Sequence, residues 1–193
     1  MSLNLGNLGS IWSSNKNMNN SVKRNNLIKT NIKTIINNNT NKNTRAKKFW
    51  GTPTWYLFHT IAERIDENFY ANNYSIFWNF INLCCSNLPC PICKNHAMDY
   101  LNNANIEQIK TKNGLRIFLF NFHNKTNKYG NSVIQSTSIL DKYKKANISA
   151  IFDLFENRFF FSYIGNRTFT DWVKNKFKIE YKNFINKIKD HLK

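Results

Sequence analysis

Residues 75–93, SIFWNFINLCCSNLPCPIC, decide the fold of this chain. The three- and four-residue spacing of one helix face is kept by Ile76, Phe77, Phe80, Ile81 and Cys84. The sequence Asn-Leu-Pro at 87–89 then interrupts the helix, and Cys-Pro-Ile-Cys follows at 90–93. In a thioredoxin-like protein a CxxC pair follows a β-strand, whereas here a helix precedes it. We therefore predict an all-α protein with a cysteine pair at a helix start.

Three further helices are predicted around this stretch. Gly51-Thr52-Pro53 is typical of a helix start, with Thr52 as N-cap and Pro53 at the first helical position. Apolar residues at helical spacing then continue to Ile65, and similar patterns follow the cysteine pair. The four predicted helices cover residues 52–65, about 75–85, about 90–101 and about 115–128. Short connections between four amphipathic helices indicate an antiparallel four-helix bundle, with a short helix following it.

Two segments flank this bundle, which we assign to residues 44–145. Residues 1–43 are rich in Asn, Lys and Ser and contain no Asp or Glu. Such a segment buries too little apolar surface to offset its ordering entropy, so we predict a disordered basic tail. Residues 146–193 are rich in aromatic residues, and apolar positions from Phe169 to Leu192 trace an amphipathic helix. We predict a helical C-terminal extension, whose role no motif indicates.

The charge balance is strongly basic, with 28 Lys and Arg against 11 Asp and Glu and a net charge of +17. Such a balance favours anionic partners, but no compact Arg-rich patch indicates a specific nucleic acid. No apolar run reaches the roughly 20 residues of a membrane span, so no transmembrane segment is predicted. Residues 1–20 lack the apolar core of a signal peptide, although an acid-free basic start also resembles a mitochondrial transit peptide.

Three chemistries are open to the pair Cys90 and Cys93. A helix start stabilises a thiolate and lowers its pKa from about 8.5 into a range of roughly 3.5–7.5, which suits redox exchange. A zinc site would need Cys84 or Cys85, Cys90, Cys93 and His96, which are crowded in sequence. The third alternative is a pair of inert buried cysteines. The helix start favours redox chemistry, and an all-helical redox site needs an electron acceptor such as a flavin.

Three separated blocks now carry a resemblance to a known family. The blocks are WGTPTWYLFH at 50–59, PCPICKNH at 89–96 and HNKTN at 123–127. In order and spacing they resemble the WGxxxWxxLH, PCxxCxxH and HNxVN motifs of the Erv/ALR family of FAD-linked sulfhydryl oxidases. The resemblance covers residues 44–145, and the Asn-rich tail with one short domain is similar to members encoded by giant DNA viruses. A viral protein would act in the host cytoplasm or the virion; the alternative is the mitochondrial intermembrane space.

The resemblance implies an enzyme that forms disulfide bonds in protein substrates. By resemblance, a substrate dithiol attacks the Cys90–Cys93 disulfide through Cys90, Cys93 passes two electrons to FAD, and O2 receives them as H2O2. A homodimer is expected on the same ground.

Residues 1–83 and 94–193 hold no cysteine, so a substrate reaches Cys90 directly or through a thioredoxin-like relay. Cys84 and Cys85 are either a secondary shuttle or small core residues. The alternative function is a zinc-stabilised basic helical binding module.

The resemblance also assigns the cofactor contacts, and no metal ligands. The expected FAD-binding residues are Lys48, Trp55, His59, Cys93, His96, His123, Asn124, Asn127 and Lys128. Taken alone, Trp55 and His59 also fit a helical core, and His96 also fits a solvent-facing position. The family's valine is Thr126 here, and the stretch after it is one residue short. This leaves open which lysine meets the phosphates, with Lys144 or Lys145 as alternatives.

Overall fold

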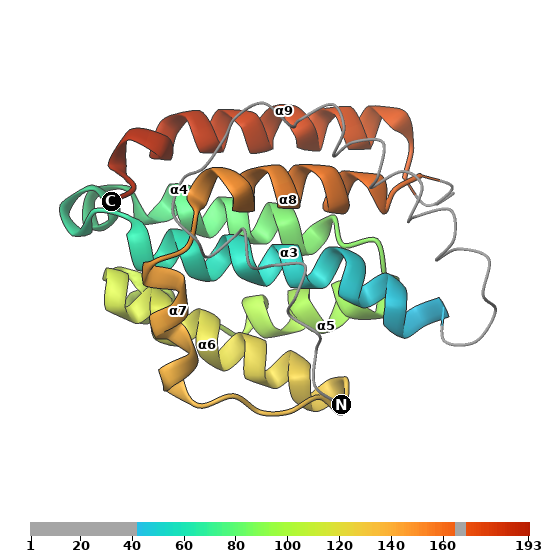
Figure 1. Cartoon of the computed structure of the whole chain (residues 1–193), viewed down its shortest axis with the longest axis horizontal. Coiled ribbons are helices and arrows are strands. Elements are labelled where there is room, and N and C mark those ends of the chain that lie inside the picture. The colour runs from blue at the N-terminus through green and yellow to red at the C-terminus, as the bar shows by residue number, and fades with distance from the viewer. Residues whose placement is uncertain (1–41, 165–168) are drawn as a thin grey trace.

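The computed structural model describes residues 42–164 and 169–193, which fold into α-helices joined by short turns (Figure 1). Within these ranges there is no strand, and Ile65 and Leu192 form one isolated antiparallel bridge. None of the helices in the described ranges is long and apolar enough to cross a membrane. The all-α prediction is therefore confirmed. Of the predicted tail, residues 1–41 lie outside the described residues.

Four helices form the central bundle: α3 (Lys42–Arg64), α4 (Glu67–Ser86), α5 (Pro91–Asn102) and α6 (Lys112–Tyr129). Helix α6 packs against the other three, and α4 also packs against α5. The bundle core is built from the apolar faces of these helices, including Leu57, Ile61, Phe77, Phe80, Leu115 and Leu119. The turn η2 (Ile106–Ile109) leads into α6 and passes very close to Gly114, where a Cβ would lie 1.8 Å from the Gln108 carbonyl oxygen.

Helix α3 begins ten residues before the predicted start at Thr52, so Pro53 lies inside the helix. Proline normally ends a helix because it donates no hydrogen bond and clashes with the preceding turn. Here the preceding turn is held by aromatic contacts, because Trp50 packs edge-on against Phe159 and Phe49 against Phe161. Tertiary packing therefore extends a helix that the local signal would have started later.

Helix α4 also begins earlier than the predicted start near Ser75. Asp66 is its N-cap and accepts a hydrogen bond from the Phe69 amide at 2.9 Å. At Asn73 the backbone leaves helical geometry (φ −131°, ψ 15°), so the helix is kinked there. The apolar spacing restarts after this kink, which is why the sequence pattern indicated only the second part of the helix.

The C-terminal extension folds against the bundle. After η3 (Thr137–Leu140) and α7 (Asp141–Lys144), α8 (Ile148–Phe161) runs along α3. Helix α9 (Asp171–Ile188) packs against α4, and η4 (Lys189–His191) follows it (Figure 1). Phe184 of α9 stacks on Phe80 of α4 with ring centroids 3.8 Å apart. The predicted helical extension thus shares one core with the bundle.

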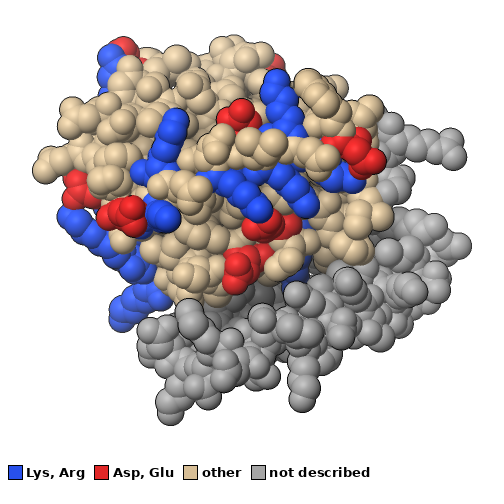
Figure 2. Space-filling model, turned by 90° about the horizontal axis from the view of Figure 1, so that it is seen from above, with Lys and Arg blue, Asp and Glu red and all other residues tan. Residues whose placement is uncertain are grey.

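The surface over α8 and α9 carries charges of both signs. Figure 2 shows blue Lys and Arg side chains alternating with red Asp and Glu side chains on this face, without a single basic patch. Two of the neighbouring pairs are Lys174–Asp171 at 2.8 Å and Lys182–Glu156 at 3.8 Å. Exposed pairs of this kind contribute little to stability.

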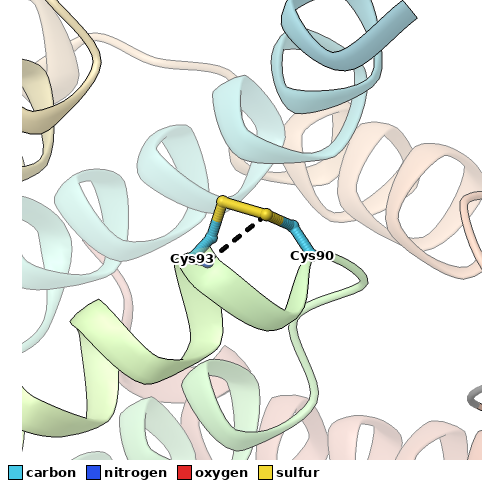
Figure 3. The surroundings of a disulfide bond; sticks show 2 residues. All are labelled: Cys90 and Cys93. Atoms are coloured by element: carbon cyan, nitrogen blue, oxygen red, sulfur yellow. Dashed lines mark hydrogen bonds between the residues drawn. A yellow bond between two sulfur atoms is a disulfide. The ribbon is translucent and has the colours of Figure 1, made fainter.

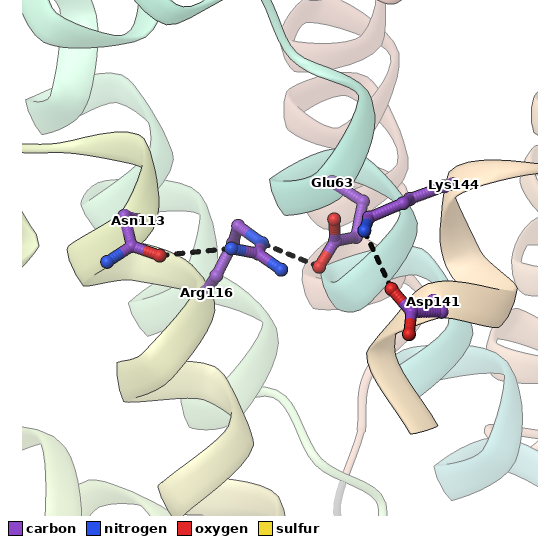
Figure 4. A network of polar contacts seen from close by, with 5 residues as sticks. All are labelled: Glu63, Asn113, Arg116, Asp141 and Lys144. Atoms are coloured by element: carbon purple, nitrogen blue, oxygen red, sulfur yellow. Dashed lines mark hydrogen bonds and ion pairs between the residues drawn. The ribbon is translucent and has the colours of Figure 1, made fainter. Parts of the chain in front are cut away.

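A buried carboxylate ties α3 to α6. The Glu63 side chain is almost fully buried and accepts a hydrogen bond from Arg116 Nε at 2.6 Å (Figure 4). Arg116 Nη1 also donates to Asn113 Oδ1 at 3.0 Å. An unpaired buried charge would be costly, so the pair fixes the relative position of the two helices. The neighbouring pair Lys144–Asp141, at 2.6 Å, belongs to α7.

Candidate active site

The Cys90–Cys93 pair forms a disulfide at the start of α5, with Cα atoms 5.2 Å apart. Cys90 is the N-cap of this helix and Pro91 is in its first turn. Cys90 Sγ accepts a hydrogen bond from the Cys93 amide at 3.3 Å (Figure 3). Cysteine thus takes the N-cap role usually filled by Ser, Thr, Asp or Asn, because α5 offers unpaired amides there. The same amides favour negative charge on Cys90 when the disulfide opens.

The disulfide lies at the surface of the bundle. Both cysteines are half-buried, and Ile92 between them is 66% exposed. The two cysteines therefore do not differ clearly in exposure. They differ in their position in the helix. Only Cys90 stands at the N-cap, and Cys93 lies one turn further along α5. Both cysteines also pack against the core, so the exposed part of this turn is Pro91 and Ile92.

The other two cysteines lie in a different environment. Cys84 and Cys85 are free thiols in the last turn of α4, with exposed fractions of 0% and 2%. Burial raises the pKa of Cys84 well above its usual value, with a further contribution from Cys85. Burial also raises the pKa of Cys85 to about 12. Both side chains are thus protonated core residues in this structure.

A cluster of aromatic rings and histidines gathers residues from α3, α6 and α7. We call Trp55, His59, His123, Lys142 and Tyr143 the histidine cluster. The Trp55 and His123 rings stack with centroids 4.1 Å apart and an angle of 8°. His59 stacks on Tyr143 at 4.8 Å, and His59 Nε2 lies 3.0 Å from His123 Nδ1. The Lys142 ammonium lies 4.8 Å from the centre of the Tyr143 ring.

Burial keeps both histidines of this cluster uncharged. Burial lowers the pKa of His59 well below its usual value, and His123 and Lys142 lower it further. Burial and the nearby Lys142 lower the pKa of His123 to about 3. In a neutral imidazole one nitrogen donates and the other accepts. At neutral pH the contact between the two histidines is therefore an ordinary hydrogen bond between neutral rings.

Aromatic contacts connect the histidine cluster to the cysteine helix. Trp55 packs edge-on against Phe122 at 5.2 Å, and Phe122 stacks on Tyr100 of α5 at 4.6 Å and 5°. Tyr100 lies two turns after Cys93 on the same helix. The cluster therefore packs, through Phe122, against the same helix that begins at the disulfide.

The other predicted contacts lie on the outer part of α6 and α5. Asn124 holds the loop after α6, because it donates to the Gln135 carbonyl and accepts from the Gln135 amide. Asn127 donates to the Val133 carbonyl of the same loop at 3.2 Å. His96 is exposed and stacks on Tyr129 at 4.4 Å. Both asparagine side chains thus form hydrogen bonds with the loop after α6, whereas His123 faces α3.

The lysines that were expected to meet the phosphates do not lie together in the structure. Lys128 is exposed near the end of α6, and the side chain of Lys48 lies outside the described part of the structure. Lys144 pairs with Asp141, whereas Lys142 contributes to the lowered pKa of both histidines. Lys142 and Tyr143 were not predicted. Residues 142–145 contain three lysines, and only the packing of α7 decides which of them faces inward, so the sequence holds no clear signal for this choice.

The cluster fits a flat ligand that carries an anionic group. His59 Nδ1 is buried and has no hydrogen-bond partner among the described residues, so a polar group is missing there. Trp55 and His123 already touch each other, so a flat ring would stack on an outer face of this pair. Lys142 supplies a cation beside them. Stacking surfaces, an unpaired nitrogen and a cation are the groups that a dinucleotide requires.

Comparison with known proteins finds a similar family and a similar viral protein. Over 81 residues the chain is 32% identical to a protein named as an FAD-linked sulfhydryl oxidase in Invertebrate iridescent virus 3. The match covers 42% of this chain and 55% of the relative, so the chain spans about half of that relative's length. No solved structure matches the chain significantly. The model of the Erv1 / Alr family matches residues 52–145, which include the disulfide and the histidine cluster. Residues 52–145 of this chain are therefore similar to the Erv1 / Alr family.

Proposed function

We propose that this protein is an FAD-dependent thiol oxidase that forms disulfide bonds in polypeptide substrates. The observation that carries the proposal is the Cys90–Cys93 disulfide at a helix N-cap inside an Erv1/Alr domain. The histidine cluster supports it, because the Trp55 and His123 rings offer a flat stacking surface and Phe122 connects Trp55 to the cysteine helix.

The chain's own residues account for the exchange with substrate. A substrate thiolate attacks Cys90 Sγ, the disulfide breaks, and Cys93 leaves as a thiolate. A second substrate thiolate then attacks the mixed disulfide and releases Cys90. The products are an oxidised substrate and the Cys90–Cys93 dithiol, with two electrons transferred. The Cys93 amide, 3.3 Å from Cys90 Sγ, stabilises the departing Cys90 thiolate and assists the second step.

FAD, when bound, supplies the two-electron acceptor that returns the dithiol to the disulfide and passes the electrons to O2. In this proposal Trp55 and His123 stack against the flat part of the cofactor, and His59 Nδ1 gains its missing hydrogen bond. Lys142 faces the phosphates in place of Lys144. Lys48, His96, Asn124, Asn127 and Lys128 keep their predicted roles as further proposals.

The partners and compartment follow as proposals from the same domain. The described residues contain no second disulfide, so we propose that the substrate or a thioredoxin-like relay brings its own cysteines to Cys90. The viral relative supports a protein that acts in the host cytoplasm or virion. The expected homodimer is also kept as a proposal.

The purified full-length chain tests the function through its absorbance spectrum and its oxygen consumption. We expect flavin bands at about one FAD per chain, and oxygen uptake when dithiothreitol is added. A colourless protein that consumes no oxygen after FAD is added would refute the proposal.

The metal content of the purified protein tests the alternative function, a zinc-stabilised binding module. Its ligand set is not gathered in the described residues, where no group of three or more His, Cys, Asp or Glu side chains could hold a metal.

A further inference from the structure

A tyrosine of the C-terminal extension is bonded to the turn that leads into the disulfide. Tyr163 follows the end of α8 and is 2% exposed. Its hydroxyl donates a hydrogen bond to the backbone carbonyl oxygen of Asn87. The two residues are 76 positions apart in sequence, and Tyr163 lies outside the Erv1/Alr segment 52–145.

Asn87 lies three residues before Cys90, and the turn that it begins also includes Leu88, which is buried and whose amide donates to the Cys85 carbonyl at 3.4 Å. Asn87 is the C-cap of α4, its amide donates to the Cys84 carbonyl at 3.2 Å, and its side chain donates to the Leu83 carbonyl at 2.8 Å. Only Leu88 and Pro89 separate it from Cys90. The Asn87 carbonyl lies beyond the helix, so an intrahelical amide does not satisfy it. Tyr163 therefore anchors the start of a short segment, three peptide bonds long, that leads to Cys90.

The anchor itself is packed into the core. The Tyr163 ring packs on Phe159 at 5.6 Å and stacks on Phe169 at 4.4 Å. Phe159 is fully buried and also contacts Trp50 of α3. The turn is thus held by a side chain that the core of the extension immobilises, and that core reaches the helix carrying Trp55.

We propose that Tyr163 is a positioning residue that holds Cys90 near Cys93 when the disulfide is reduced. In the disulfide state the covalent bond itself keeps Cys90 at the N-cap. In the dithiol state only non-covalent contacts do so, and the Tyr163–Asn87 hydrogen bond is one of them. Loss of this bond therefore loosens the dithiol more than the disulfide and makes the disulfide easier to reduce. The consequence for turnover rests on the proposed oxidase function, whereas the redox equilibrium does not.

The test is the variant Tyr163→Phe, which keeps the ring and removes only the hydroxyl. Full-length protein is equilibrated in glutathione buffers of set ratio, and the dithiol fraction is measured by alkylation and mass spectrometry. We expect a three- to tenfold shift of the equilibrium toward the dithiol, or about 15–30 mV. In the reduced variant, hydrogen exchange at the Leu88 and Cys90 amides should also accelerate.

Tyr181→Phe is the matched control. Tyr181 is equally buried and donates to the Phe152 carbonyl at 3.2 Å, a bond between α9 and α8 that does not touch the turn. We expect this variant to leave the redox equilibrium and the two amides unchanged. Equal shifts in both variants, or no shift in Tyr163→Phe, would overturn the proposal. A chain that binds no flavin but shows the shift would refute the oxidase function and leave the role of Tyr163 supported.

Discussion

Two cysteine pairs lie within ten residues of each other and differ in almost every physical respect. Cys84 and Cys85 end α4, are fully buried and have free thiols with a raised pKa. Cys90 and Cys93 begin α5, are half-buried and share a disulfide. The amides at a helix start favour negative charge, whereas the carbonyls at a helix end disfavour it. From this comparison we expect that position in the helix and depth of burial decide which thiols are reactive.

The largest effect expected from this contrast is on turnover. Cys93→Ser leaves no disulfide to receive electrons, so we expect oxygen consumption with dithiothreitol to fall to background while bound flavin remains. Cys84→Ala should keep turnover per folded molecule within about twofold, since small buried residues are interchangeable at modest cost. If Cys84→Ala abolished turnover in folded protein, the deeper pair would be a relay and the contrast would fail.

A second expected difference concerns alkylation rates in reduced protein. At pH 8 a thiol at the ordinary pKa of about 8.5 is partly ionised, whereas one with a pKa of about 12 is ionised in about one molecule in ten thousand. We therefore expect iodoacetamide to modify Cys90 about a thousand times faster than Cys85, apart from any protection by burial. Mass spectrometry of timed digests measures both rates. Similar rates for the two residues would show that α4 opens readily.

The smallest effect is on stability at high pH. The pKa of Cys85 is raised in the folded protein, so its stabilising contribution is complete below the unfolded pKa of about 8.5 and declines as the pH rises toward 12. Between pH 7 and pH 10 the loss from this one thiol is about 2 kcal/mol. Urea unfolding of the reduced protein should show a decline that is smaller by this amount in Cys85→Ala. An identical pH dependence in the two proteins would contradict the raised pKa.

Part of the site was predictable because its signals are local. The start of α5 at the cysteine pair follows from Asn-Leu-Pro before it and from the first-turn proline. Trp55, His59 and His123 were predicted by resemblance, and the structure brings their rings together. Lys142 was not predicted, because in a run of similar lysines only the packing of α7 decides which one faces inward.

The sequence by itself determined the all-helical class, the break before Cys90 and the similarity of residues 52–145 to the Erv1 / Alr family. These depend on short-range spacing and on motif order, which are written along the chain. Tertiary structure alone decided that α3 continues through Pro53, that Lys142 joins the histidine cluster and that Tyr163 reaches Asn87. Each of these contacts joins segments far apart in sequence. Their free energy comes from burial and from hydrogen bonds that form only when the helices pack, so local patterns do not contain them.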